Sequence, residues 1–174
     1  METPKPQHTL TPNIEDKDIY KYTIDTRNFE VSLFWQRSNY FLALNSALAI
    51  GFFSSQGSAY KCVLVLLGFI ASILWYQVNL GSKYWQSRWE HRLQLVEKEI
   101  APGLDLFSAS PDTVEADVRA SLQFNDHGKI RKYFDDQILS KPSVSFCMTL
   151  LSLAFAFSWV LTGCIYLVTL ICKL

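Results

Sequence analysis

The sequence predicts an all-α membrane protein with three transmembrane helices and a helical cytoplasmic region. The prediction rests on three observations. Charged residues are segregated from apolar runs, although the chain as a whole is 49% hydrophobic and 18% charged. The uncharged runs approach or exceed the length of a membrane span. Outside these runs, apolar residues recur at the spacing of helix faces.

The clearest predicted span covers residues 143–172. No charged side chain occurs in residues 144–172, a run longer than the roughly 20 residues that a transmembrane helix needs. Lys141-Pro142 precedes the run and Lys173 follows it. Because the run is too short for two antiparallel spans, we expect one helix that tilts or extends beyond the lipid.

The second predicted span covers residues 62–81, which consist mainly of Leu, Val, Ile, Phe and Ala. Aromatic residues that favour the membrane interface surround its end, namely Trp75, Tyr76, Tyr84 and Trp85. We expect the same helix to continue into the cytoplasm over residues 82–101. The Ala101-Pro102-Gly103 sequence then ends it.

The first predicted span, residues 35–54, has a weaker pattern. Only residues 40–53 form a mainly apolar run, and Asn45 interrupts even this run. A run this short is also typical of a buried or re-entrant segment. Including Trp35 and Arg37, whose long side chain can reach the interface, brings the segment to span length. The short linker that follows, with Gly57 at its centre, predicts a tight hairpin.

The distribution of basic residues predicts the orientation of the spans. All Lys and Arg residues except Lys61 and Lys173 fall on one side of the three-span arrangement. The positive-inside rule assigns that side to the cytoplasm. We therefore expect a multi-pass protein of the bacterial inner membrane, with the N-terminus and residues 82–142 cytoplasmic and the C-terminus periplasmic.

The rest of the predicted cytoplasmic region has three parts. Residues 1–14 are polar and contain proline, which indicates a disordered or loosely docked tail without a cleaved signal peptide. Residues 15–36 have loosely helical apolar spacing, so we expect an amphipathic helix that leads into the first span. Residues 102–142 predict a helical cap of two short helices. The first begins at Ser110-Pro111-Asp112, which supplies an N-cap and a first-turn proline, and the second follows a turn at residues 125–128.

The predicted extension over residues 82–101 has an apolar stripe on one helix face. Its members recur at intervals of three or four residues. They form the candidate oligomer interface: Trp85, Trp89, Leu93, Val96 and Ile100. Such an apolar face needs a partner, either the N-terminal helix of the same chain or the same helix of a neighbouring subunit.

Polar residues within or beside the first two spans form a candidate intramembrane polar seam: Arg37, Asn45, Gln77 and Asn79. Such side chains are costly against hydrocarbon and should face other helices, water or the interface. The seam is interpreted either as a polar pathway or subunit contact, or as hydrogen bonding between helices. The predicted spans contain no Asp or Glu, which argues against a proton-coupled transporter.

No sequence pattern indicates catalysis, a cofactor or a metal site. Nucleotide-binding, zinc-protease and hydrolase motifs are absent. The four cysteines lie singly in apolar runs, without the spacing of metal ligands. Equal numbers of basic and acidic residues, 16 of each, give no basic surface for nucleic acid. We expect no enzymatic activity, no catalytic, cofactor-binding or metal-binding residue, and no small-molecule substrate.

Two strings of sequence are distinctive, one at the start of the first predicted span and one shortly after the second. One is Phe34-Trp35-Gln36-Arg37-Ser38-Asn39-Tyr40-Phe41-Leu42, followed by Leu44-Asn45. The other is Trp85-Gln86-Ser87-Arg88-Trp89-Glu90, followed by residues 93–97. Together they resemble the RipA-like family of small bacterial cytoplasmic-membrane proteins, over the chain from about Asp18 onward. The resemblance implies a homo-oligomeric, octameric membrane assembly without catalytic activity, and no functional residues carry over.

The leading hypothesis is therefore a non-enzymatic homo-oligomer of the bacterial inner membrane. It would have a cytoplasmic helical assembly, a structural or regulatory role, and only its own copies and membrane lipid as partners. The alternative is an oligomeric channel or pore-forming effector, with Asn45 and the Ser/Thr face of the third span lining a path. A third hypothesis is an enzyme that uses His91 or His127 on the cytoplasmic side.

Overall fold

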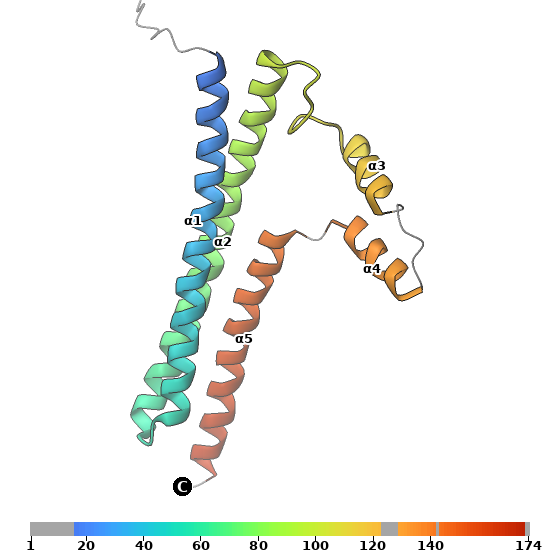
Figure 1. The fold of residues 1–174 in the computed structure, drawn as a ribbon. Helices are drawn as coiled ribbons and strands as arrows, with labels where there is room; N and C mark the ends of the chain where they lie inside the picture. The colour runs from blue at the N-terminus through green and yellow to red at the C-terminus, as the bar shows by residue number, and fades with distance from the viewer. Residues whose placement is uncertain (1–15, 123–128, 142, 173–174) are drawn as a thin grey trace, which may run out of the picture.

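The computed structural model describes residues 16–122, 129–141 and 143–172. The expected tail over residues 1–14 and the expected turn with His127 lie outside this part of the chain. The described residues form five helices in the order α1 (Asp16–Ser54), α2 (Ser58–Ile100), α3 (Pro111–Leu122), α4 (Lys129–Leu139) and α5 (Val144–Ile171). The helices α1, α2 and α5 make a long bundle, and α3 and α4 form a pair beside it (Figure 1).

Helix α1 runs without a break from its charged half into its apolar half. No proline occurs along it, so the backbone hydrogen bonds continue across the boundary between the two halves. Gly57, in an extended conformation, then precedes α2. The short turn makes α1 and α2 an antiparallel hairpin (Figure 1).

Helix α2 has 43 residues and is therefore roughly 65 Å long. This length is about twice the 30 Å hydrocarbon core of a bilayer, so α2 extends far beyond any membrane that it crosses. The helix ends where the Ala101 N–H bonds to the Glu97 carbonyl oxygen at 2.8 Å. Gly103 follows with a φ of +88°, a conformation that glycine adopts without steric cost.

Two helices are long and apolar enough to cross a membrane, α2 over Ala59–Ile100 and α5 over Val144–Ile171. Only 28% and 17% of their most apolar windows are buried, whereas a core helix of a soluble protein is mostly buried. Helix α1 does not meet the same criterion, because Arg37, Asn39 and Asn45 lower the hydropathy of its apolar half. The structure therefore has two candidate spans and does not establish the third predicted one.

Helix α5 packs closely against α2. Ser143 caps its N-terminus by accepting a hydrogen bond from the Phe146 N–H. Gly68 of α2 lies directly under the Trp159 indole, and a Cβ at this position would overlap the ring. Small residues at such crossings allow helix backbones to approach one another closely.

The core of the bundle contains as many polar as apolar residues. The buried apolar side chains are Phe34, Phe52, Ala71, Trp75, Leu93, Val96, Ala156 and Trp159. The buried polar or charged side chains are Ser38, Asn45, Ser72, Asn79, Ser82, Gln86, Glu97 and Ser152. Most of the large apolar side chains of the spans point outward instead. This inverted pattern suits helices surrounded by lipid, which associate through close packing and hydrogen bonds.

The short helices α3 and α4 pack on each other and not against the long hairpin (Figure 1). No residue of α3 is buried. Large apolar side chains of the pair are exposed, namely Val114, Tyr133, Phe134 and Ile138. Helices of 12 and 11 residues offer too little surface to bury these side chains between themselves. The predicted helical cap is thus an isolated helix pair within one protomer.

Candidate functional site

The candidate site consists of the polar contacts that connect α2 with α1 on one side and with α5 on the other. Asn45 of α1 is the junction of all three helices and is fully buried. Its Oδ1 accepts hydrogen bonds from Ser72 Oγ and from Trp159 Nε1, each at 2.9 Å. Its Nδ2 donates to the Phe41 carbonyl oxygen at 3.0 Å. These bonds replace hydration and thereby offset the cost of burying an amide among apolar side chains.

Asn79 connects α2 to α5. Its Nδ2 donates to the Met148 carbonyl oxygen at 3.1 Å. Two turns further along α2, Gln86 Oε1 accepts a hydrogen bond from Ser145 Oγ at 3.2 Å. Both side chains are buried, so this line of contacts holds the first half of α5 against α2.

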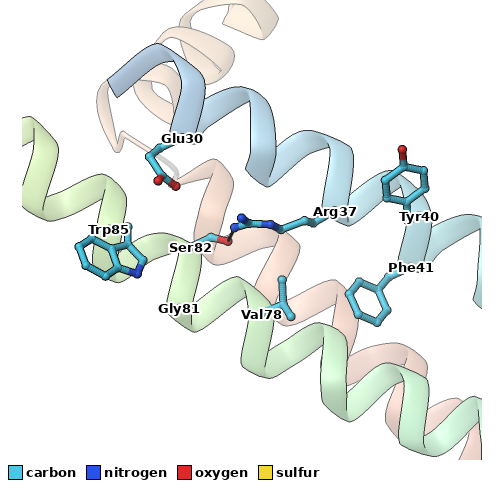
Figure 2. Close-up of a pocket in the computed structure, with 8 residues that line it drawn as sticks. All are labelled: Glu30, Arg37, Tyr40, Phe41, Val78, Gly81, Ser82 and Trp85. Carbon is cyan, nitrogen blue, oxygen red and sulfur yellow. Dashed lines mark hydrogen bonds between the residues drawn. The ribbon is translucent and has the colours of Figure 1, made fainter. Parts of the chain in front are cut away.

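Arg37 lies where the apolar half of α1 begins. Its Nη1 donates to Ser82 Oγ of α2 at 3.3 Å (Figure 2). The ion pairs found among the described residues do not include Arg37. The guanidinium projects into a cavity of about 540 Å³ between α1 and α2, which we call the Arg37 groove. Glu30 lines the same groove nearer the N-terminus of α1, and Phe41 lines it nearer the apolar half (Figure 2).

The structure therefore brings three members of the predicted polar seam into contacts between helices and leaves out the fourth. Gln77 is exposed on the outer face of α2. Two residues along a helix correspond to about 200° of rotation, so Gln77 points away from α5 when Asn79 points toward it. Sequence spacing shows this divergence, but only the packing shows which of the two side chains is inside.

The structure also divides the predicted apolar stripe. Leu93 and Val96 are buried, and Val96 and Ile100 line a small cavity together with Ile19 of α1. The N-terminal helix of the same chain therefore covers this end of the stripe. Trp89 and Ile100 are half-buried, and Trp85 is 42% exposed. The half of the stripe nearest the apolar run remains open in the protomer.

Glu97 is a functional candidate that the sequence analysis did not single out. It is fully buried, and its carboxylate accepts hydrogen bonds from the N–H groups of Leu106, Phe107 and Ser108 at 3.1, 2.8 and 2.6 Å. The Tyr20 hydroxyl donates to the same carboxylate at 3.2 Å. Glu97 follows Leu93 by one helical turn, and this spacing was the available signal for its burial.

The ionisation of Glu97 reflects these contacts. Burial opposes ionisation, but the hydrogen bonds from Phe107, Ser108 and Leu106 outweigh it and hold the pKa of Glu97 below its ordinary value of 4.5. Burial and the adjacent carboxylate raise the pKa of Tyr20 above 10.0. At neutral pH, a charged Glu97 therefore attaches the segment after α2 to both helices of the hairpin.

The described residues offer little for catalysis or metal binding. Within them, no group of three His, Cys, Asp or Glu side chains lies close enough to hold a metal ion. The cysteines Cys62, Cys147, Cys164 and Cys172 are exposed and free. His91 is exposed on α2. The absence of enzymatic activity stays a prediction.

One comparison with known proteins identifies a family. The sequence model of a family described as "Octameric membrane protein family (8xMP)" matches residues 17–168. The match extends from the start of α1 to near the end of α5. No curated protein and no solved structure matches the chain. The match supports a small oligomeric membrane protein in general, and it does not confirm the RipA-like name.

Proposed function

Because the chain belongs to the octameric membrane protein family, we propose that it is a non-enzymatic scaffold of the bacterial inner membrane. Three helices of each protomer, α1, α2 and α5, cross the membrane. Helices on the cytoplasmic side join eight protomers into one assembly. The role of this assembly is structural or regulatory, and its partners are copies of the chain and membrane lipid.

The side-chain contacts of α1 with both apolar helices, α2 and α5, support three crossings. Asn45 bonds α1 to both α2 and α5, and the Phe52 ring lies 6.4 Å from the Trp159 ring. The uncharged part of α1 therefore lies at the level of the two candidate spans. Its outer face includes Ile50 and Phe53, which are 67% and 79% exposed. These side chains are favourable against lipid and costly against water.

The separation of charge along the bundle supports the proposed orientation. The charged half of α1 and the second half of α2 lie at the same end of the bundle, and α3 and α4 lie beside the bundle between that end and the start of α5 (Figure 1). The opposite end holds the turn between α1 and α2. Among the described residues at that end, Lys61 is the one basic residue. The positive-inside rule places the basic end in the cytoplasm.

The scaffold proposal rests on the unpartnered α3–α4 pair. Phe134 and Ile138 lie one helical turn apart on α4 and are 56% and 50% exposed. A two-helix unit of this size cannot bury its own apolar face, and no other helix among the described residues packs closely against it. In an octamer, a neighbouring protomer can cover this face, so the pair serves as a connector between subunits.

A double substitution on α4 tests the scaffold. We expect Phe134→Ser with Ile138→Ser to reduce the octamer to smaller species, because the contact loses most of its apolar area. Mass photometry of the detergent-solubilised protein measures the change. Asp136→Asn, on the opposite face of α4, is the matched control and should leave the octamer intact. A double variant that remains octameric would contradict the role of α4.

The exposed Gln77 favours a second candidate function, an oligomeric channel. An amide within a span is costly against lipid. In an octamer, eight copies of Gln77 on the outer faces of α2 can meet in a ring and line a polar path. Asn45 is not available for this purpose in the described fold, because its side chain is buried and bonded within the protomer.

A further inference from the structure

The Arg37 groove has an ordered series of chemical groups along its length. Phe41 and Val78 form its apolar end, Arg37 and Ser82 its middle, and Glu30 its far end (Figure 2). The apolar end faces the uncharged runs of α1 and α2, and the carboxylate end faces the charged halves of both helices. The order along the groove is therefore apolar, cationic and anionic.

The groove lies at the boundary between the uncharged and charged parts of the hairpin. On α1 the uncharged run begins at Ser38, directly after Arg37, and on α2 it ends at Ser82, directly before Lys83. The hydrogen bond between Arg37 and Ser82 puts the two boundaries at one level. Trp85 lies beside the groove and is of the residue type that favours the headgroup layer.

The donors of Arg37 are largely unused by the protein. Among the described residues, its guanidinium has one hydrogen bond, at 3.3 Å, and takes part in no ion pair. A guanidinium has five N–H donors in a planar fork that matches phosphate oxygens. Most of this fork is open to a ligand in the groove.

We propose that the Arg37 groove binds a zwitterionic phospholipid whose headgroup has an ammonium group beyond its phosphate. Arg37 and Ser82 donate hydrogen bonds to the phosphate, and Glu30 pairs with the ammonium. The first part of an acyl chain lies along Phe41 and Val78. Glu30 and Arg37 are separated by two helical turns, roughly 10 Å along the axis, and the reach of both side chains shortens this separation.

Charge complementarity favours this lipid over other occupants. A purely anionic headgroup would meet Arg37 favourably but would place its negative charge near Glu30. The inference rests on the proposed crossing of α1, since Arg37 reaches lipid phosphates only if the apolar half of α1 lies in the membrane.

Native mass spectrometry of the assembled protein tests the site. Titration with phosphatidylethanolamine and phosphatidylglycerol gives the apparent affinity for each lipid. We expect Arg37→Gln to weaken the binding of both lipids by roughly tenfold or more, because the charged donor for the phosphate is lost. We expect Glu30→Gln to remove the preference for phosphatidylethanolamine. Arg92→Gln, an exposed charge on α2 outside the groove, is the matched control.

Three results would overturn the proposal. Equal affinities for the two lipids in the wild-type protein would exclude recognition of the ammonium. Unchanged lipid binding in Arg37→Gln, or a retained preference for phosphatidylethanolamine in Glu30→Gln, would exclude the groove. Displacement of the lipid by soluble glycerophosphoethanolamine at equal concentration would show a headgroup site without a membrane role. The same spectra report subunit number, so failure of the scaffold appears separately as a loss of octamers.

Discussion

Asn45 is the residue on which the association of α1 with the other two long helices depends most directly. Its carbonyl oxygen is shared by donors from α2 and α5, and both hydrogen bonds are 2.9 Å long. Ser72 has an alternative acceptor in the Gly68 carbonyl oxygen of its own helix, at 2.8 Å. The Trp159 N–H is bonded to Asn45 alone in the described fold. The contact between Asn45 and Trp159 is therefore the one that a substitution removes without compensation.

We expect Asn45→Leu to destabilise the folded protomer by about 1–2 kcal/mol, the upper part of the range for hydrogen bonds between membrane helices. Trp159→Phe removes the donor instead. In a double-mutant cycle, the two substitutions should be less than additive, with a coupling energy of about 1 kcal/mol. Unfolding in mixed detergent micelles measures these differences. Ser46→Ala is the control, because Ser46 bonds only to the Leu42 carbonyl oxygen of its own helix. Full additivity would show that the contact contributes nothing.

At the scale of elements, the end of α2 decides where the α3–α4 pair is attached. The segment after α2 contains no regular structure up to α3, and Glu97 binds three of its consecutive N–H groups. Tyr20 of α1 contacts the same carboxylate. Glu97 thus connects both helices of the hairpin to the segment that leads into α3.

This attachment should weaken in acid. The folded pKa of Glu97 lies below the ordinary value of 4.5, so its contribution to stability is fully present above that value. The contribution is lost as the pH falls below 4.5 and through the folded pKa. Hydrogen–deuterium exchange at Leu106, Phe107 and Ser108, corrected for intrinsic rates, should show the loss of protection.

Glu97→Gln should lower this protection by roughly tenfold to a hundredfold already at neutral pH, because hydrogen bonds to a charged acceptor contribute about 1.5–3 kcal/mol. In this variant, the protection of the three amides should no longer decrease in acid through protonation of residue 97. Glu99→Gln, an exposed neighbour, serves as the control. Protection that persists in acid, or in Glu97→Gln, would show that other contacts hold the segment.

At the scale of the whole molecule, the scaffold and the channel differ in what the octamer encloses. In a scaffold, the polar side chains of the spans form hydrogen bonds between helices of the same protomer, as Asn45 and Asn79 do. In a channel, the exposed Gln77 faces a water-filled path. Both functions are compatible with one octamer, so its size alone does not separate them.

Conductance in planar bilayers separates the two functions. For a scaffold, we expect no current from the purified octamer at any voltage, and Gln77→Leu should leave both assembly and membrane insertion unchanged. Val78→Leu, a neighbouring apolar exchange, is the control for packing. A defined current that Gln77→Leu abolishes would instead support the channel.

The sequence by itself determined the helical class, the positions of the two strongest apolar runs and the separation of charge along the chain. These features depend on composition and on spacing along one helix, because hydrophobic periodicity and span length are local properties. The stop after α2 was also predictable, since Pro102 and Gly103 disfavour a continued helix.

Only the tertiary structure decided which side chains of each helix face inward. It placed Asn79 inside and Gln77 outside, divided the apolar stripe at Trp89, and buried Glu97 among backbone N–H groups. In lipid, apolar side chains are stable on either face of a helix, so the hydrophobic pattern does not identify the packed face. That face is determined by small residues and hydrogen bonds between distant segments, such as Gly68 beneath Trp159 and the bond from Trp159 to Asn45.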